Sequence, residues 1–101
     1  MSGSVKELVL NAEGWNTKND FYDAFFTAVG APPWHGRNFD ALNDSIATGR
    51  INAVEVPYRI VIRNYDRIGT GAVQIVRDFV QLILEISDRG CPVQIRTENS
   101  K

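Results

Sequence analysis

Three short strand-like segments, separated by long intervals of helical sequence, constrain the fold of this chain more than any other feature. The segments lie at residues 5–10, 58–63 and 91–96, and the middle one is dense in β-branched residues typical of strands. Parallel strands need a long crossover between them, and each interval is long enough to supply one. The chain is therefore predicted to be an α/β protein with a small three-stranded parallel sheet packed with helices.

Helix signals occupy both intervals. Thr17 is a candidate N-cap with Asp20 three residues later, and Gly30 stands where helices commonly end, so a first helix is expected between Thr17 and Gly30. A longer helix over 72–89 has one broad apolar side and stops at Gly90.

A shorter helix is predicted over 38–47. Its apolar residues recur with helical spacing at Phe39, Leu42 and Ile46, so this side is expected to be buried. The opposite side, which is expected to face outward, carries Asp40, Asn43 and Asp44.

The loop before this helix is stiff, because Pro32 and Pro33 each lack an amide hydrogen and restrict the residue before them. Trp34 follows the prolines, and an aromatic residue in such a loop either covers the core or contacts a partner. His35 is interpreted as a surface histidine rather than a pH switch or an acid–base catalyst.

Charge and cysteine content argue against several classes of protein. The 11 Lys and Arg residues are interleaved with 12 Asp and Glu residues, so no basic cluster predicts direct binding of nucleic acid. There is no apolar stretch of membrane-spanning length and no signal pattern, so a soluble cytoplasmic protein without membrane contact is expected. The single cysteine, Cys91, cannot form an intramolecular disulfide and is expected to be buried and unreactive.

The sequence does not predict an enzyme. It contains one histidine, and it lacks a nucleophile–base set, a phosphate-binding glycine loop and metal-ligand spacing. No cofactor or metal site is therefore expected. Two less supported alternatives are a small hydrolase that uses His35 with Asp40 or Asp44, and an RNA-binding regulator, which would need a basic groove with stacking aromatics.

The most unusual segment is PPWHGRNFDALND, residues 32–44. It combines a proline, an aromatic, a glycine, an asparagine, a bulky apolar residue, Asp-Ala-Leu and a second Asp four residues after the first. The predicted helix ends in Thr-Gly, and Glu85 stands five residues before the Gly90–Cys91 pair. These features resemble the barstar family of intracellular ribonuclease inhibitors.

The resemblance implies that the loop and helix fill the active site of a ribonuclease, with carboxylates in place of substrate phosphate. The partner would be a secreted ribonuclease or nuclease toxin, and the chain would act as an immunity protein or antitoxin. The implied partner-binding residues are Trp34, His35, Gly36, Asn38, Asp40, Asn43, Asp44 and Glu85. We also expect one domain over 1–101, flexible at 1–4 and 98–101, and monomeric when free.

Three positions depart from the family pattern. Arg37 replaces an acid, Asn43 replaces a tryptophan and Arg50 replaces an aromatic residue. The two arginines add positive charge beside the carboxylates, and this weakens an acidic field that would steer a strongly basic nuclease. An alternative hypothesis is therefore an interaction module of the same fold whose protein partner is not a ribonuclease.

Overall fold

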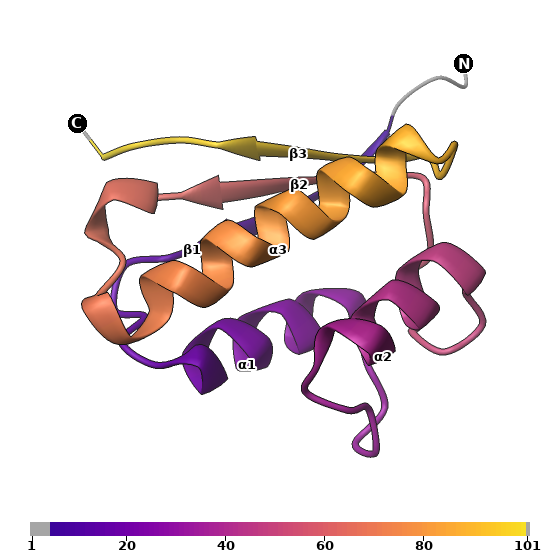
Figure 1. The fold of residues 1–101 in the computed structure, drawn as a ribbon, viewed down its shortest axis with the longest axis horizontal. Helices are drawn as coiled ribbons and strands as arrows, with labels where there is room; N and C mark the ends of the chain where they lie inside the picture. Colours follow the sequence, from indigo (N-terminus) through magenta and orange to yellow (C-terminus); the bar gives the residue numbers. More distant parts are fainter. Residues whose placement is uncertain (1–4, 101) are drawn as a thin grey trace.

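The computed structural model describes residues 5–100 and contains one three-stranded sheet (Figure 1). Its strands, in the spatial order β1-β2-β3, are β1 (Lys6–Asn11), β2 (Tyr58–Arg63) and β3 (Val93–Thr97). Both neighbouring pairs are parallel, with Leu8, Ile60 and Ile95 in register. The predicted α/β fold is confirmed. The flexibility predicted at 1–4 and at 101 lies outside the described residues.

Helical segments connect the strands. They are α1 (Lys18–Val29), α2 (Phe39–Asn43), the π-helical turn η1 (Asp44–Thr48), the 3₁₀ turn η2 (Tyr65–Arg67) and α3 (Thr70–Asp88). The predicted cap of α1 is present: the Thr17 hydroxyl accepts the Asp20 amide at 3.3 Å, and the Asp20 carboxylate accepts the Thr17 amide at 3.0 Å. Gly30 ends α1 with a φ of 65°, which glycine adopts without strain.

The short helix differs from the regular helix predicted over 38–47. The Gly49 amide donates to the Asp44 carbonyl oxygen, five residues back, at 3.2 Å, so the last turn is wider than an α-helical turn. α2 therefore gives way to η1 at Asp44, while Leu42 and Ile46 both remain buried as predicted. Within residues 5–100, no helix has the length and apolar character needed to cross a membrane.

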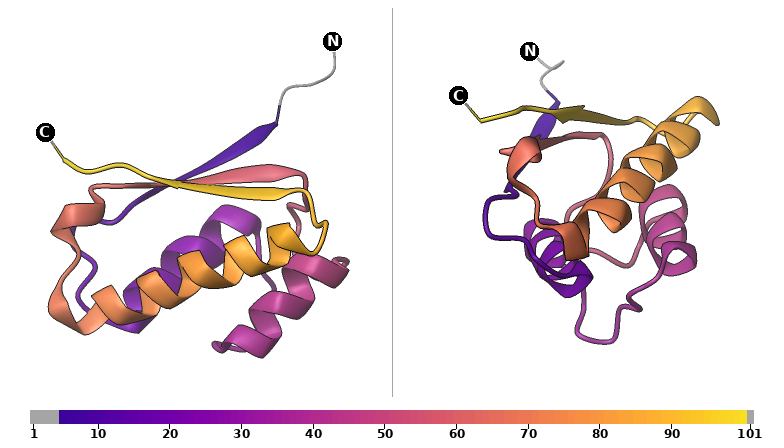
Figure 2. Two further views of the ribbon diagram at one scale, coloured as in Figure 1. Left: turned by 45° about the horizontal axis from the view of Figure 1, so that its top comes forward. Right: turned by 60° about the vertical axis from the view of Figure 1, so that its left-hand side comes forward.

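The helices all lie on one face of the sheet, which gives the molecule two layers (Figures 1 and 2). An aromatic cluster forms the centre of the core. Phe79 of α3 contacts Phe21 and Phe25 of α1, with ring centroids 4.8 and 5.1 Å apart. Burial alternates along β1, where Leu8 and Leu10 face the helices. The core thus joins the sheet to α1 and α3.

The opposite face of the sheet is mostly polar, with Val9 and Val61 as its apolar residues, and we call it the open sheet face. Its charged and amide side chains are Glu7, Asn11, Arg59, Arg63, Gln94, Arg96 and Glu98. Arg59 pairs with Glu7 at 2.9 Å and hydrogen-bonds to Gln94 at 3.1 Å. Glu98 pairs with Arg96 at 3.0 Å and with Arg63 at 3.6 Å. The acids of this face therefore have cations of the same face as partners.

Candidate functional site

The loop between α1 and α2 presents Trp34 to solvent. The His35 amide donates to the Pro32 carbonyl oxygen at 3.0 Å, which closes a turn with Pro33 and Trp34 as its central residues. Proline presets the backbone at the first of these positions. Trp34 is 72% exposed, so the interpretation that it covers the core is wrong. The side chain is accessible to a partner.

His35 lies on the inner side of the same turn. It is only 7% exposed, so the expectation of a surface histidine is wrong. Its Nδ1 lies 2.9 Å from the Gly36 carbonyl oxygen, and its Nε2 lies 2.9 Å from the Ser45 hydroxyl oxygen. The ring packs against Phe26 of α1, with centroids 4.5 Å apart. The turn that directs Trp34 outward directs the following residue inward.

Gly36 and Asn38 join this loop to the first turn of α2. The Asn38 side-chain oxygen accepts the Ala41 amide at 2.8 Å and caps the helix. A Cβ at position 36 would lie 3.0 Å from the side-chain Nδ2 of Asn38 and 3.3 Å from the Ala41 Cβ. A side chain at position 36 would therefore crowd the Asn38 cap and require it to shift.

Asp40 and Asp44 stand four residues apart, one helical turn along the α2–η1 segment, and both are exposed. Among residues 5–100, neither carboxylate forms an ion pair with a Lys, Arg or His side chain. Their charges are therefore not neutralised by the part of the chain that the structure describes.

Glu85 is exposed in the C-terminal half of α3, and α3 packs against the α2–η1 segment through α2. The Cys91 thiol, just after α3, reaches the Ile46 carbonyl oxygen of η1 at 3.9 Å, which supports this proximity. Glu85 also makes no ion pair within the described range. We give the name acidic face to the exposed residues Trp34, Asp40, Asp44 and Glu85, which the sequence predicted as partner contacts.

Asn43 is less exposed than predicted. Its Oδ1 is buried and has no hydrogen-bond partner among residues 5–100. The reason is its helical position: Asn43 follows Phe39 by four residues and precedes Ile46 by three, so it borders the buried stripe. Asn43 therefore lies at the edge of the acidic face and partly beneath it.

The Arg37 guanidinium points toward α1. Its Nη2 pairs with Asp23 at 2.6 Å, and its Nη1 donates to the Asn19 side-chain oxygen at 3.2 Å. Its Cζ lies 5.4 Å from the centroid of the Phe26 ring, within the range of a cation–π contact. Because Asp23 balances this charge, Arg37 weakens the field of the α2 carboxylates less than the sequence predicted.

The contact between Ser45 and His35 is not arranged as a catalytic pair. Ser45 is 4% exposed and His35 7%, so the hydroxyl is screened from a substrate. His35 Nδ1 contacts the Gly36 carbonyl oxygen rather than an orienting carboxylate such as Asp40 or Asp44. The hydrolase alternative gains no support from this geometry.

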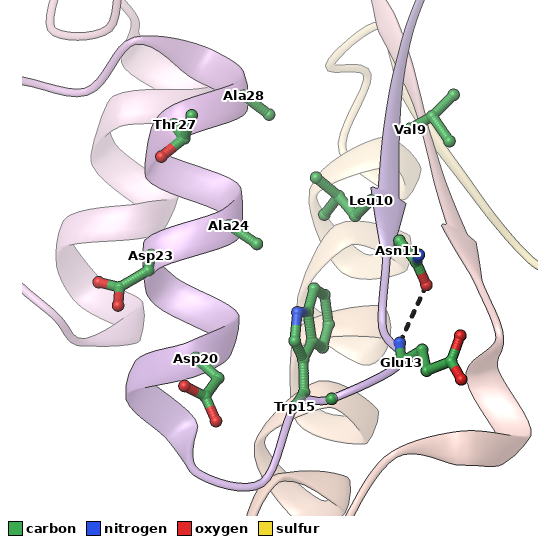
Figure 3. Close-up of a pocket in the computed structure, with 11 residues that line it drawn as sticks. Val9, Leu10, Asn11, Glu13, Trp15, Asp20, Asp23, Ala24, Thr27 and Ala28 are labelled. Atoms are coloured by element: carbon green, nitrogen blue, oxygen red, sulfur yellow. Dashed lines mark hydrogen bonds between the residues drawn. The ribbon is translucent and has the colours of Figure 1, made fainter.

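An open surface groove of about 550 Å³ lies between β1 and α1 (Figure 3). Its lining is mixed apolar and acidic, and includes Leu10, Glu13, Trp15, Asp20, Asp23 and Ala24. Asp20 accepts the amides of Asn16 and Thr17 at 2.8 and 3.0 Å, and these bonds lower its pKa. Asp23 holds Arg37. Both carboxylates already have partners within the chain.

Nowhere in residues 5–100 do three His, Cys, Asp or Glu side chains gather as metal ligands would.

Cys91 is half-buried, whereas the sequence predicted a buried residue. The reason is that Cys91 and Pro92 lie in the loop before β3, which begins only at Val93. Burial raises the pKa of the thiol, which lowers its thiolate fraction at neutral pH. Low reactivity remains a prediction.

Two residues that hold the loop were not predicted. Ser45 is 10 residues from His35, and Asp23 is 14 residues from Arg37. The available signal for Ser45 was its position three residues after Leu42 and directly before Ile46, which places it beside the buried stripe. Asp23 stands on α1 with no comparable signal.

Comparison with models of known protein families agrees with the resemblance seen in the sequence. A sequence model of the family described as "Barstar (barnase inhibitor)" matches residues 5–98, which is nearly the whole chain. No curated protein sequence matches the chain.

Proposed function

The chain belongs to the barstar family, and from this we propose that it is a protein inhibitor that binds and blocks the active site of a ribonuclease. The description of the family as a barnase inhibitor supports a protein partner of this class. The finer parts of the proposal are that the ribonuclease is a secreted toxin and that the chain protects the cell in which it is made.

The observation that carries the proposal is the acidic face. Trp34 is 72% exposed, and Asp40 and Asp44 are exposed without an intramolecular cation among residues 5–100. Unpaired carboxylates one helical turn apart fit a cleft lined by Arg, Lys or His, such as one that binds substrate phosphate. Their field also speeds encounter with a basic partner.

We assign the partner-binding residues to two roles. Trp34, Asp40 and Asp44 form the centre of the contact, with Glu85 at its rim. Interfaces derive most of their binding energy from a few central aromatic and charged groups. The other predicted site residues shape this centre: His35, Gly36 and Asn38 hold the loop, and Asn43 borders the carboxylates.

The test is capture and inhibition. Wild-type protein is immobilised and exposed to the lysate and the culture medium of the native cell, and the captured material is assayed for RNA cleavage. We expect a ribonuclease that free wild-type protein inhibits at a ratio of one to one, and that Asp40→Ala/Asp44→Ala protein fails to retain.

The matched control is Glu7→Ala/Glu98→Ala, which removes two carboxylates from the open sheet face and should retain the partner. Capture of a partner without ribonuclease activity would favour the interaction-module hypothesis. Equal capture by wild type and both double mutants would overturn the assignment of the acidic face. The protective role is tested separately: co-expression with the captured nuclease should restore growth to cells that the nuclease alone kills.

A further inference from the structure

His35 and Ser45 form a buried polar contact that the proposed function does not by itself require. They are 7% and 4% exposed, in a core that is otherwise almost entirely apolar. Their contact at 2.9 Å joins the loop between α1 and α2 to η1, across 10 residues of sequence. A buried polar pair of this kind is retained only if its hydrogen bonds are satisfied.

The hydrogen-bond donors can be assigned from the partners. The Gly36 carbonyl oxygen can only accept, so His35 Nδ1 carries the hydrogen of that 2.9 Å bond. In the neutral imidazole Nε2 is then an acceptor. The single hydroxyl hydrogen of Ser45 is donated to it at 2.9 Å in preference to the Leu42 carbonyl oxygen, which lies farther away at 3.3 Å. Both ring nitrogens are satisfied, one within the loop and one by η1.

The position of this contact connects it to Trp34. His35 directly follows Trp34, and its amide closes the turn on Pro32 at 3.0 Å. Its ring packs on Phe26 of α1, with centroids 4.5 Å apart. Fixing the ring between Phe26 and Ser45 therefore fixes one end of the turn, while the tryptophan itself remains exposed.

We propose that His35 is a positioning residue for partner binding, and that its hydrogen bond to Ser45 holds the turn in the conformation that presents Trp34. This inference rests on the proposed function. A preorganised turn loses less conformational freedom on docking, so the bond strengthens binding without touching the partner. If the turn opens in some molecules, the apparent affinity for the partner falls in proportion to the fraction of molecules that still have the closed turn.

Two conservative variants separate the two bonds of the ring. In His35→Asn the amide occupies the place of Nδ1 and can still donate to Gly36, but it is too short to reach Ser45. In His35→Gln the longer amide occupies the place of Nε2 and can still bond with Ser45. If His35 only fills buried space, the two variants should behave alike. The proposal predicts instead that only His35→Gln behaves as wild type.

The first measurement needs no partner. Protein labelled with fluorotryptophan has one fluorine NMR signal from Trp34 and one from Trp15, which Trp34→Phe distinguishes. We expect His35→Asn and Ser45→Ala to narrow the Trp34 signal and move it toward that of unfolded protein, while His35→Gln leaves it in place. The signal of buried Trp15 reports in the same sample whether the variant is folded. An unchanged Trp34 signal in folded His35→Asn and Ser45→Ala would overturn the proposal.

The second measurement uses the captured ribonuclease. Ser45→Ala and His35→Asn should weaken binding by about tenfold, and His35→Gln by less than about threefold. In a Trp34→Ala background Ser45→Ala should cost almost nothing more, because the bond acts through the tryptophan. A full additional loss in that background would contradict the proposal. If wild type itself inhibits no ribonuclease, the proposed function fails, and the fluorine signals still decide whether the bond holds the turn.

Discussion

The two faces of this molecule use charge in opposite ways. On the open sheet face, Arg59 pairs with Glu7 at 2.9 Å and Arg96 pairs with Glu98 at 3.0 Å. On the acidic face, Asp40 and Asp44 are exposed and make no ion pair within the range that the structure describes. Paired surface charges cancel each other's field and contribute little stability. Unpaired charges of one sign produce an electrostatic field that attracts a partner of opposite charge. We therefore expect recognition of the partner to take place on the helical layer.

The largest effect should come from the carboxylates of the acidic face. Replacing Asp40 or Asp44 with alanine should weaken partner binding by about 2–5 kcal/mol for whichever carboxylate is fully desolvated in the complex, because its cationic mate is then left buried and unpaired. Thermal denaturation should be nearly unchanged, since both side chains are exposed. Titration calorimetry with the captured partner measures the first quantity. If Asp40→Ala and Asp44→Ala both bind the partner as wild type does, the acidic face has no special role in binding.

Trp34→Ala should have the next largest effect, about 2 kcal/mol of binding free energy. The side chain is 72% exposed in the free protein, so its loss should not lower the melting temperature. A melting temperature several degrees lower, measured alongside the affinity, would mean that Trp34 stabilises the fold and does not serve mainly as a partner contact. Trp34→Phe is the conservative control and should recover part of the binding.

Salt should separate the two faces kinetically. The association rate of wild type should fall as ionic strength rises, because salt screens the steering field. Asp40→Ala/Asp44→Ala should associate more slowly at low salt and show a weaker dependence, whereas Glu7→Ala/Glu98→Ala should retain the wild-type slope. Stopped-flow mixing over a series of salt concentrations measures all three slopes. Equal slopes for the two double mutants would contradict the assignment of steering to the acidic face.

On the open sheet face the effects should be small. Arg59→Gln removes the ion pair with Glu7, and an exposed pair of this kind is worth about 0.2–1 kcal/mol. Urea denaturation should show a loss of that size, and partner affinity should not change. A tenfold loss of partner affinity in a folded Arg59→Gln protein would mean that the partner binds the open sheet face, which contradicts the assignment to the acidic face.

The smallest effect concerns Asp20, a carboxylate that the chain itself uses. Amide hydrogen bonds, first from Asn16 and then from Thr17, lower its pKa below the ordinary 3.8. Its contribution to stability is therefore present above the unfolded pKa and is lost as the pH falls through the lower folded value. Asp20→Asn should flatten the acid end of the stability profile and leave neutral-pH binding unchanged. NMR titration of the Asp20 carboxyl group measures the pKa, and a value at or above 3.8 would contradict this assignment.

The sheet could be predicted because its determinants are local or general. Strand composition and crossover length decide parallel pairing, and the Thr17 cap of α1 and the Leu42 stripe of α2 need only nearby residues. The interior of the site could not be predicted in the same way. The burial of His35 depends on Ser45 and Phe26, and the position of Arg37 depends on Asp23, all of which are brought together by folding. Helical spacing alone also left Asn43 on the exposed side, although it borders the buried stripe.

The parallel sheet also has a consequence for the speed of folding. Arg59 of β2 is 52 residues from its cross-strand neighbour Glu7 and 35 residues from Gln94. Each strand pair must therefore close a long loop, and lose the corresponding chain entropy, before its contacts can form. The Asn38 cap and the turn on Pro32 close over three residues each. We therefore expect the loop that carries Trp34 to take shape early. Closure of the sheet should come last and set the folding rate.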